Sequence, residues 1–267
     1  MSAPPRFARC VGIDYSGAAG ASDPLPGLRV CVAEPGGPCE PVSPPGRRRH
    51  WSRRGVAEWL GEAVHAGETL LVGVDHGFSM PESYFRRHGL ADWPSFLEDF
   101  RRHWPTDRDD CPVEVLRDPL RRAALPGVPA ALRGGRADEY RLCERWTASA
   151  KSVFHFDVQG SVAKSTHAGL PWLAWLRERC GPALWCWPFD GWDPPRGRSV
   201  IAEAYPSLVR HRYARDGRGP DLHDAWSVAR WLADTVERDI LGRYLAPPLT
   251  PAERDLASRE GWILGVS

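Results

Sequence analysis

Residues 9–17 read Arg-Cys-Val-Gly-Ile-Asp-Tyr-Ser-Gly, a short apolar run that ends in an aspartate and a glycine-containing turn. A second run, Leu-Leu-Val-Gly-Val at residues 70–74, is followed by Asp75, His76 and Gly77. Both runs predict strands, and each strand ends at an acidic residue. Because a carboxylate at the end of a buried strand is costly unless it is paired or binds a cation, Asp14 and Asp75 are candidate functional residues.

Two further acidic residues occupy comparable places in the sequence. Glu203 follows the apolar run Ser199–Ala202, and Asp224 opens an amphipathic helix that we expect to begin near His223. Two strands that end in Asp, a third that carries Glu and a helix that starts with Asp predict one convergent divalent-metal site. Asp221, three residues before Asp224, is a reserve candidate for the same site.

The first part of the chain predicts three antiparallel strands, a helix and a central strand. The loops between the first strands are too short to hold a helix, so these strands should pair antiparallel. Val56–His65 has helical spacing and leads into a continuously apolar strand, which indicates a strand covered on both faces and an α/β fold. Strands are expected at 9–14, 28–33, 49–52, 69–74, 183–188 and 199–205, and further helices at 95–104, 138–148, 170–179, 222–238 and from Thr250.

Length and composition bound the organisation of the chain. It has 267 residues, of which 42% are hydrophobic and 26% charged, so it can bury a core and disorder is not expected. We expect a single domain over residues 1–267 with an insertion at about 81–150, where a segment rich in Arg, Pro and Gly separates short helical pieces.

Charge and hydropathy narrow the class of protein. A net charge of +1 argues against a strongly basic nucleic-acid module, although it leaves room for a local basic groove. The sequence begins without an apolar signal-peptide region and contains no apolar run of about 18 residues. We therefore expect a cytoplasmic protein.

Four short motifs carry a family resemblance: Gly12–Ala18, Gly73–His76, Glu203–Pro206 and His223–Ala225. In this order they resemble the signature blocks of the family catalogued as domain of unknown function 429, described as a predicted ribonuclease H-like nuclease. The resemblance runs from residue 12 to about residue 232. It implies a ribonuclease H-like mixed sheet, three antiparallel strands and then parallel ones, flanked by helices and carrying an inserted helical or irregular subdomain. The final Asp-Ala helix also resembles that of Holliday-junction resolvases.

The resemblance implies hydrolysis of phosphodiester bonds in DNA or RNA with Mg²⁺ or Mn²⁺. Two such ions about 4 Å apart relieve the repulsion between a negative nucleophile and a phosphate. Asp14 is then expected to bridge both ions, Asp75 to bind one and Asp224 the other. Glu203 is the fourth catalytic candidate, as a ligand or as a base beyond the ligands.

Other residues are candidates for contacts with the substrate. Ser16 could bind a phosphate oxygen, Lys164 could contact a phosphate in the cleft, and His76 and His223 could move protons at neutral pH. Residues 160–166 do not form a phosphate loop, because the glycines that this motif requires are absent. An arginine-rich stretch at 47–54 could track a nucleic-acid backbone, and a second one at 117–136 could line the cleft if the insertion folds over the site.

Each candidate also has a purely structural interpretation. Asp14 could close a turn, Asp75 could cap a strand, Asp224 could be the N-cap of its helix and Glu203 could pair with an arginine. At the level of the whole chain, two alternatives to a nuclease remain. One is a non-catalytic nucleic-acid-binding scaffold with the same fold, and the other is a phosphotransferase of the sugar-kinase and actin type.

Overall fold

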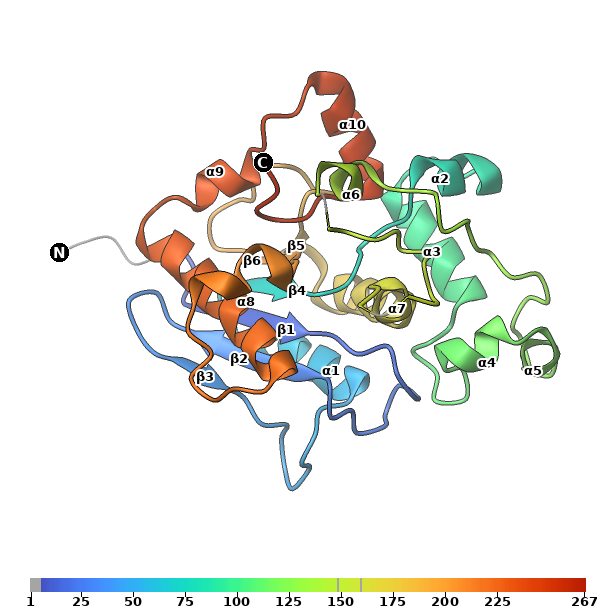
Figure 1. Cartoon of the computed structure of the whole chain (residues 1–267), viewed down its shortest axis with the longest axis horizontal. Helices are drawn as coiled ribbons and strands as arrows, with labels where there is room; N and C mark the ends of the chain where they lie inside the picture. The colour runs from blue at the N-terminus through green and yellow to red at the C-terminus, as the bar shows by residue number, and fades with distance from the viewer. Residues whose placement is uncertain (1–5, 148, 159) are drawn as a thin grey trace.

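The computed structural model describes residues 6–147, 149–158 and 160–267, and these residues form an α/β fold around a mixed sheet (Figure 1). The sheet has six strands in the order β3-β2-β1-β4-β6-β5 within this part of the chain. β1 pairs antiparallel with β2, and β2 with β3, whereas β1, β4, β6 and β5 run parallel. The strands are β1 Arg9–Asp14, β2 Arg29–Ala33, β3 Cys39–Pro41, β4 Leu70–Val74, β5 Leu184–Cys186 and β6 Ser199–Glu203.

Ten α-helices in the described residues surround this sheet. Helix α8 crosses one face, over β1 and β2, while α1 and α7 pack together on the other face (Figure 1). The helices are α1 Arg53–His65, α2 Glu82–His88, α3 Trp93–His103, α4 Val113–Arg117, α5 Pro119–Ala123, α6 Leu142–Trp146, α7 Ala163–Cys180, α8 Pro220–Glu237, α9 Leu241–Leu245 and α10 Pro251–Glu260.

The prediction of the third strand was wrong in position. β3 is Cys39–Pro41, and residues 49–52 form no strand. A tight reversal at Gly36, whose φ of +72° suits glycine, brings Cys39 opposite Ala33. Pro41 is tolerated because it lies at the end of an edge strand, where no ladder hydrogen bond is required of it.

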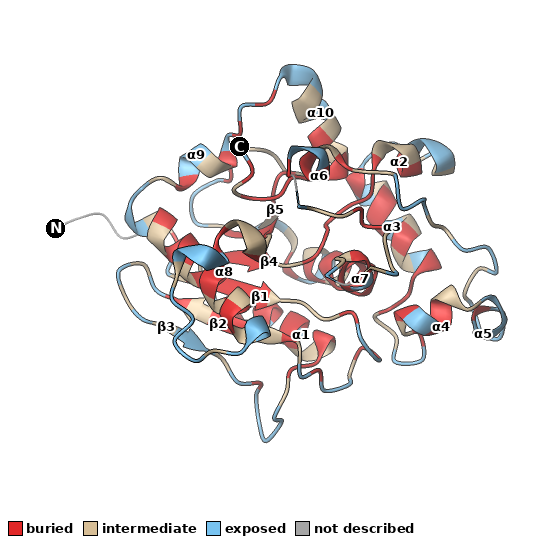
Figure 2. Cartoon of the chain, viewed as in Figure 1, coloured by how far each residue is buried: buried red, intermediate tan, exposed pale blue. Residues whose placement is uncertain are grey.

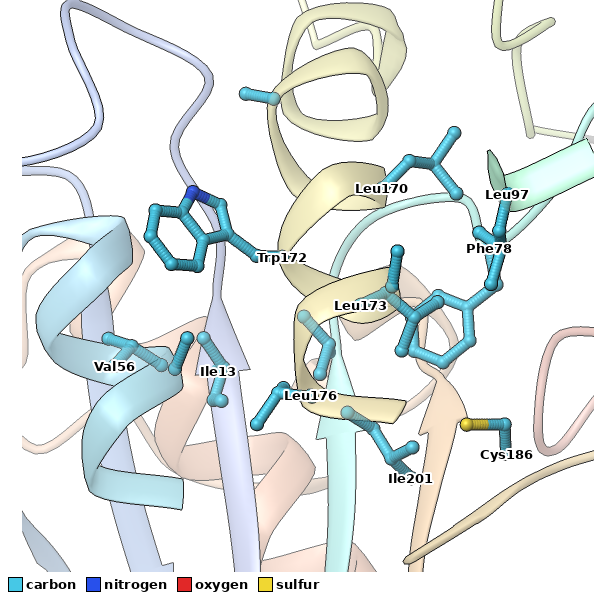
Figure 3. Close-up of a cluster of buried hydrophobic side chains, with 14 of the residues drawn as sticks. Ile13, Val56, Phe78, Leu97, Leu170, Trp172, Leu173, Leu176, Cys186 and Ile201 are labelled. Atoms are coloured by element: carbon cyan, nitrogen blue, oxygen red, sulfur yellow. The ribbon is translucent and has the colours of Figure 1, made fainter. Parts of the chain in front are cut away.

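Side chains that alternate along the strands divide the core into two layers. Val11, Ile13 and Val72 point to the layer under α1 and α7, part of which appears in Figure 3, and Cys10 and Leu71 point to the layer under α8. The central strands and the inner sides of the helices are buried, whereas the edge strand β3 is largely exposed (Figure 2). Side chains at positions 12 and 14 of β1 therefore belong to the α8 face.

Two glycines let α8 approach the sheet closely. Gly12 and Gly73 lie opposite each other on β1 and β4. A Cβ added at Gly12 would lie 2.1 Å from the carbonyl oxygen of Ala225, and one at Gly73 would lie 2.7 Å from Cγ1 of Val228. The absence of side chains at this pair places the first turns of α8 beside the ends of β1 and β4.

The region expected as an insertion, residues 81–150, contains α2 to α6, which lie beyond the α7 side of the sheet (Figure 1). The helix expected at 138–148 is the single turn α6, and residue 148 lies outside the described part of the chain. The helix expected at 170–179 begins earlier, at Ala163, and continues through Pro171. Among the described residues, no helix has the length and apolar character needed to cross a membrane.

Candidate acidic site

The carboxyl groups of Asp14 and Asp75 form the centre of the candidate site. Asp14 ends β1, and Asp75 directly follows β4. These two strands are neighbours in the sheet. The two side chains lie close enough to share a hydrogen bond when one of them carries a proton. Burial, followed by the negative charges nearby, raises the pKa of Asp14 to about 9 and that of Asp75 to about 7.

Helix α8 adds two carboxylates to this pair. Asp221 and Asp224 lie one helical turn apart, and the charge of each contributes to the raised pKa of Asp14. Burial raises the pKa of Asp224 as well, although the adjacent Arg210 guanidinium opposes the shift. Asp224 does not open its helix, as the sequence suggested, because α8 begins at Pro220, four residues earlier.

Glu203 lies on the other face of the sheet, although its negative charge contributes to the raised pKa of Asp75. In the parallel pairing of β4 with β6, Glu203 lies opposite Val74, whose side chain belongs to the α1 and α7 layer. The Glu203 carboxylate accepts hydrogen bonds from both terminal nitrogens of Arg141, each at 2.7 Å, and from the backbone N–H of Phe78 at 3.1 Å. Its charge is therefore neutralised inside the protein, which corresponds to the structural interpretation of this residue.

The two candidate histidines make mainly structural contacts. His76 is buried in the α1 and α7 layer, where its Nδ1 lies 2.9 Å from the carbonyl oxygen of Gly77, and burial lowers its pKa to about 4. His76 is therefore neutral at physiological pH and lies on the face opposite Asp14. His223 lies next to Asp224 in α8, and its Nε2 donates to the carbonyl oxygen of Arg210 at 3.1 Å.

Ser16 and Lys164, in contrast, share a cleft of about 390 Å³ with Asp14 and Asp221. Gly17 allows this arrangement, because a Cβ there would lie 2.3 Å from the backbone of Lys164 at the start of α7. Lys164 donates to Glu114 of α4 at 2.9 Å, and both side chains are about half exposed. The cleft therefore contains a cation beside the acidic pair, together with a further carboxylate that partly neutralises it.

Parts of the two arginine-rich stretches are buried and cannot contact a ligand. Arg53 is fully buried, and its guanidinium donates to the carbonyl oxygens of Ser16, Ala18 and Ala19. Arg122 is likewise buried and donates to backbone carbonyls of its own subdomain. Exposed arginines at 47–49 and 121 remain available for contacts at the surface.

No set of three or more His, Cys, Asp and Glu side chains in the described residues is arranged so that it could hold a metal ion by itself. The predicted trio Asp14, Asp75 and Asp224 is therefore not a ready-made ligand set. The pair Asp14 and Asp75 nevertheless fits a hard cation, since two adjacent, partly buried carboxylates with raised pKa values are stabilised by a positive charge. Mg²⁺ is commonly bound through one or two carboxylates, with waters and substrate phosphates completing its shell.

Comparisons of the chain with protein-family models, with curated proteins and with solved structures find no match. The chemistry of the site is therefore inferred from the arrangement of its own residues. That arrangement brings together Asp14, Asp75, Asp221 and Asp224, with Ser16 and Lys164 at the edge of the same cleft.

The sequence did not identify two residues of the site, Arg210 and Glu114, and it identified a third, Asp221, only as a reserve candidate. Asp221 ranked only as a reserve, although its spacing of three from Asp224 places both on one helix face. Arg210 and Glu114 carried no signal, because Arg210 lies in a short 3-10 turn 14 residues from Asp224, and Glu114 lies in the short helix α4, 50 residues from Lys164. Such ion pairs depend on tertiary folding and have no local sequence pattern.

Proposed function

We propose that this protein is a divalent-metal-dependent phosphodiesterase that acts on nucleic acid and has a ribonuclease H-like fold. The observation that carries the proposal is the pair of carboxyl groups at the ends of the adjacent parallel strands β1 and β4. Such a pair destabilises the fold by mutual repulsion and desolvation unless a cation or a proton neutralises it. Its position at the carboxyl ends of parallel strands, at the edge of a cleft, is typical of functional sites in α/β proteins.

Asp14 and Asp75 would hold Mg²⁺ or Mn²⁺ directly, and Asp221 and Asp224 would act on the same ion through water molecules. A bound divalent ion would activate water and stabilise charge on a phosphodiester. Ser16 and Lys164 would contact the phosphate, since a hydroxyl and an ammonium at the edge of the cleft are suitable donors to it. We assign Glu203 and His76 no role in the chemistry, because both point to the other face.

Nucleic acid is the substrate class that best fits this group of residues. The cleft is open to solvent and carries Lys164 and three serines, but its acidic residues outnumber its single cation. An anionic backbone would therefore bind weakly to the bare protein and more strongly once a divalent ion has neutralised the aspartates. Binding of the oligonucleotide is accordingly expected to depend on the metal.

The proposal is tested first by metal binding. Mn²⁺ titrated into the chelator-treated protein in a calorimeter should bind, and Asp14→Asn should abolish the binding. Glu58→Gln, which removes an exposed carboxylate on α1, is the matched control and should bind as the unchanged protein does. Unaltered Mn²⁺ affinity in Asp14→Asn would exclude the site.

Cleavage is tested next with labelled single-stranded, double-stranded and branched DNA and RNA, with Mn²⁺ or with chelator. A nuclease should cut at least one of these only when the metal is present, and Asp75→Asn should be inactive. The neutralisation of Glu203 favours one alternative, a non-catalytic scaffold. Such a scaffold would bind the same oligonucleotides equally well in chelator and would cut none of them.

A further inference from the structure

One guanidinium lies at the acidic site without belonging to the core. Arg210 starts the short 3-10 helix η3, Arg210–Arg212, in the segment that joins β6 to α8. Its Nη1 lies 3.1 Å from Oδ2 and 3.4 Å from Oδ1 of Asp224. The side chain of Arg210 is 49% exposed, whereas that of Asp224 is 17% exposed. The cation therefore reaches the site from solvent.

The backbone of Arg210 is held independently of its side chain. Its carbonyl oxygen accepts the hydrogen bond from Nε2 of His223, and its turn is closed by the backbone hydrogen bond from Tyr213. The guanidinium can consequently leave Asp224 while the turn stays in place. Arg141 offers a contrast, because its buried guanidinium donates to both oxygens of Glu203 and to Glu144 and cannot be exchanged without disrupting the core.

Exposure makes the Arg210 contact a weak one. Water screens a half-exposed ion pair, and part of its Coulomb energy is offset by the entropy of holding a long side chain. A divalent ion held by Asp14 and Asp75 carries twice the charge, and its bound waters can donate hydrogen bonds to the same Asp224 carboxylate. While the Asp224 carboxylate accepts hydrogen bonds from Arg210, it cannot also orient the waters of a divalent ion, so the two cations compete for Asp224.

We propose that Arg210 is the resident counter-cation of the acidic site, which a divalent ion must displace from Asp224, and that the freed guanidinium then binds a phosphate oxygen of the substrate. A guanidinium suits this second position, because its fork of N–H donors matches phosphate geometry. The inference rests on the proposed function, since it assumes that a divalent ion enters this site.

The first half of the inference is tested by Mn²⁺ titration of the metal-free protein. Arg210→Ala should bind Mn²⁺ about two- to fivefold more tightly than the unchanged protein, because a competing cation is gone. Arg210→Lys should stay near the unchanged protein, since it keeps the charge. Arg212→Ala, which removes an exposed arginine from the same turn, is the matched control and should alter the affinity less than Arg210→Ala.

The outcomes separate this inference from the proposed function. If the unchanged protein fails to bind Mn²⁺, the proposed function falls and this inference with it. If it binds Mn²⁺ but Arg210→Ala has the same affinity, or Arg212→Ala gains as much, this inference alone is overturned. In an Asp224→Asn background the Arg210→Ala substitution should no longer change Mn²⁺ affinity, because the contact that couples them has been removed.

The second half is tested by fluorescence anisotropy with short labelled oligonucleotides in Ca²⁺, which replaces Mn²⁺ to slow hydrolysis. Arg210→Ala should bind them at least about threefold more weakly, although it binds the metal more tightly. A parallel gain in the affinities for metal and oligonucleotide would show that Arg210 only opposes binding, and would overturn its role toward phosphate.

Discussion

At the scale of single residues, two properties determine which acidic side chains can act together: the face of the sheet on which each lies and the residue that each contacts. Asp14 and Asp75 share the α8 face with Gly12 and Gly73, whereas Glu203 alternates to the opposite face. The register of β4 with β6 fixes this difference, because Gly73 pairs with Ala202 and so places Glu203 opposite Val74. The partner that neutralises Glu203, Arg141, is 62 residues away and follows no sequence pattern.

The raised pKa of Asp14 predicts how stability depends on pH in chelator. Between about pH 4 and pH 9 the folded protein keeps a proton on this carboxyl that the unfolded chain releases. The folded state thus binds more protons, and the free energy of unfolding should fall as the pH rises through this range. Urea denaturation at a series of pH values measures the slope.

Asp14→Asn should remove much of that slope and should raise the melting temperature of the metal-free protein at pH 8 by roughly 5 °C, since it removes a desolvated, repelled carboxylate. Glu58→Gln serves as the control and should leave the slope unchanged. A profile that is flat between pH 5 and pH 9 in the unchanged protein would contradict the interpretation of the pair.

At the scale of elements, apolar runs and caps identified most strands and helices, and long-range pairing decided the rest. β1, β2, β4, β5 and β6 lie at or within a few residues of their predicted places, and Thr250 is the N-cap of α10 as its sequence indicates. β3 was misplaced because it has only three residues, two of them Cys and Pro, and forms by pairing with β2. Its composition alone is that of a loop.

The close contact of α8 with β1 predicts the effect of a single methyl group. Gly12→Ala should destabilise the protein by about 1–3 kcal/mol in urea denaturation, because the new Cβ would meet the backbone of Ala225 and Ala229 and force the helix outward. The same shift moves Asp221 and Asp224 away from Asp14, so Mn²⁺ affinity should fall as well.

Gly242→Ala is the matched control for this substitution. Gly242 lies in α9, and a Cβ there would have no heavy atom within 4 Å. Alanine favours a helix over glycine by about 1 kcal/mol, so this variant should be as stable as the unchanged protein or more stable. If both variants lost the same free energy of unfolding, the contact at Gly12 would not determine how closely α8 approaches the sheet.

At the scale of the whole molecule, one buried network connects segments far apart in the sequence. Arg141 donates to Glu203 of β6 and to Glu144 of α6. Glu260, at the end of α10, accepts the backbone N–H groups of Glu82 and Leu142, each at 2.6 Å. The sheet, the segment that contains α2 to α6 and the last helix are therefore held together by charges that lie almost wholly inside the protein.

Removal of the Arg141 side chain should strongly lower the free energy of unfolding. Arg141→Ala leaves Glu203 and Glu144 buried without their partner, and should cost about 3–5 kcal/mol of the free energy of unfolding. Arg136→Ala breaks an exposed pair with Asp138, in which the side chains of Arg136 and Asp138 are 77% and 65% exposed, and should leave the free energy of unfolding almost unchanged. Urea denaturation compares the two, and similar losses would contradict the structural role of the network.

The end of the described chain also completes the sheet. Ile263 bridges to Glu203, the N–H of Leu264 donates to the carbonyl oxygen of Glu203 at 2.9 Å, and residues 262–264 are buried. During translation, therefore, the core cannot close until this segment has emerged from the ribosome. A nascent chain stalled before Trp262 has left the exit tunnel should remain sensitive to protease, whereas a chain stalled after residues 262–264 have emerged should be resistant.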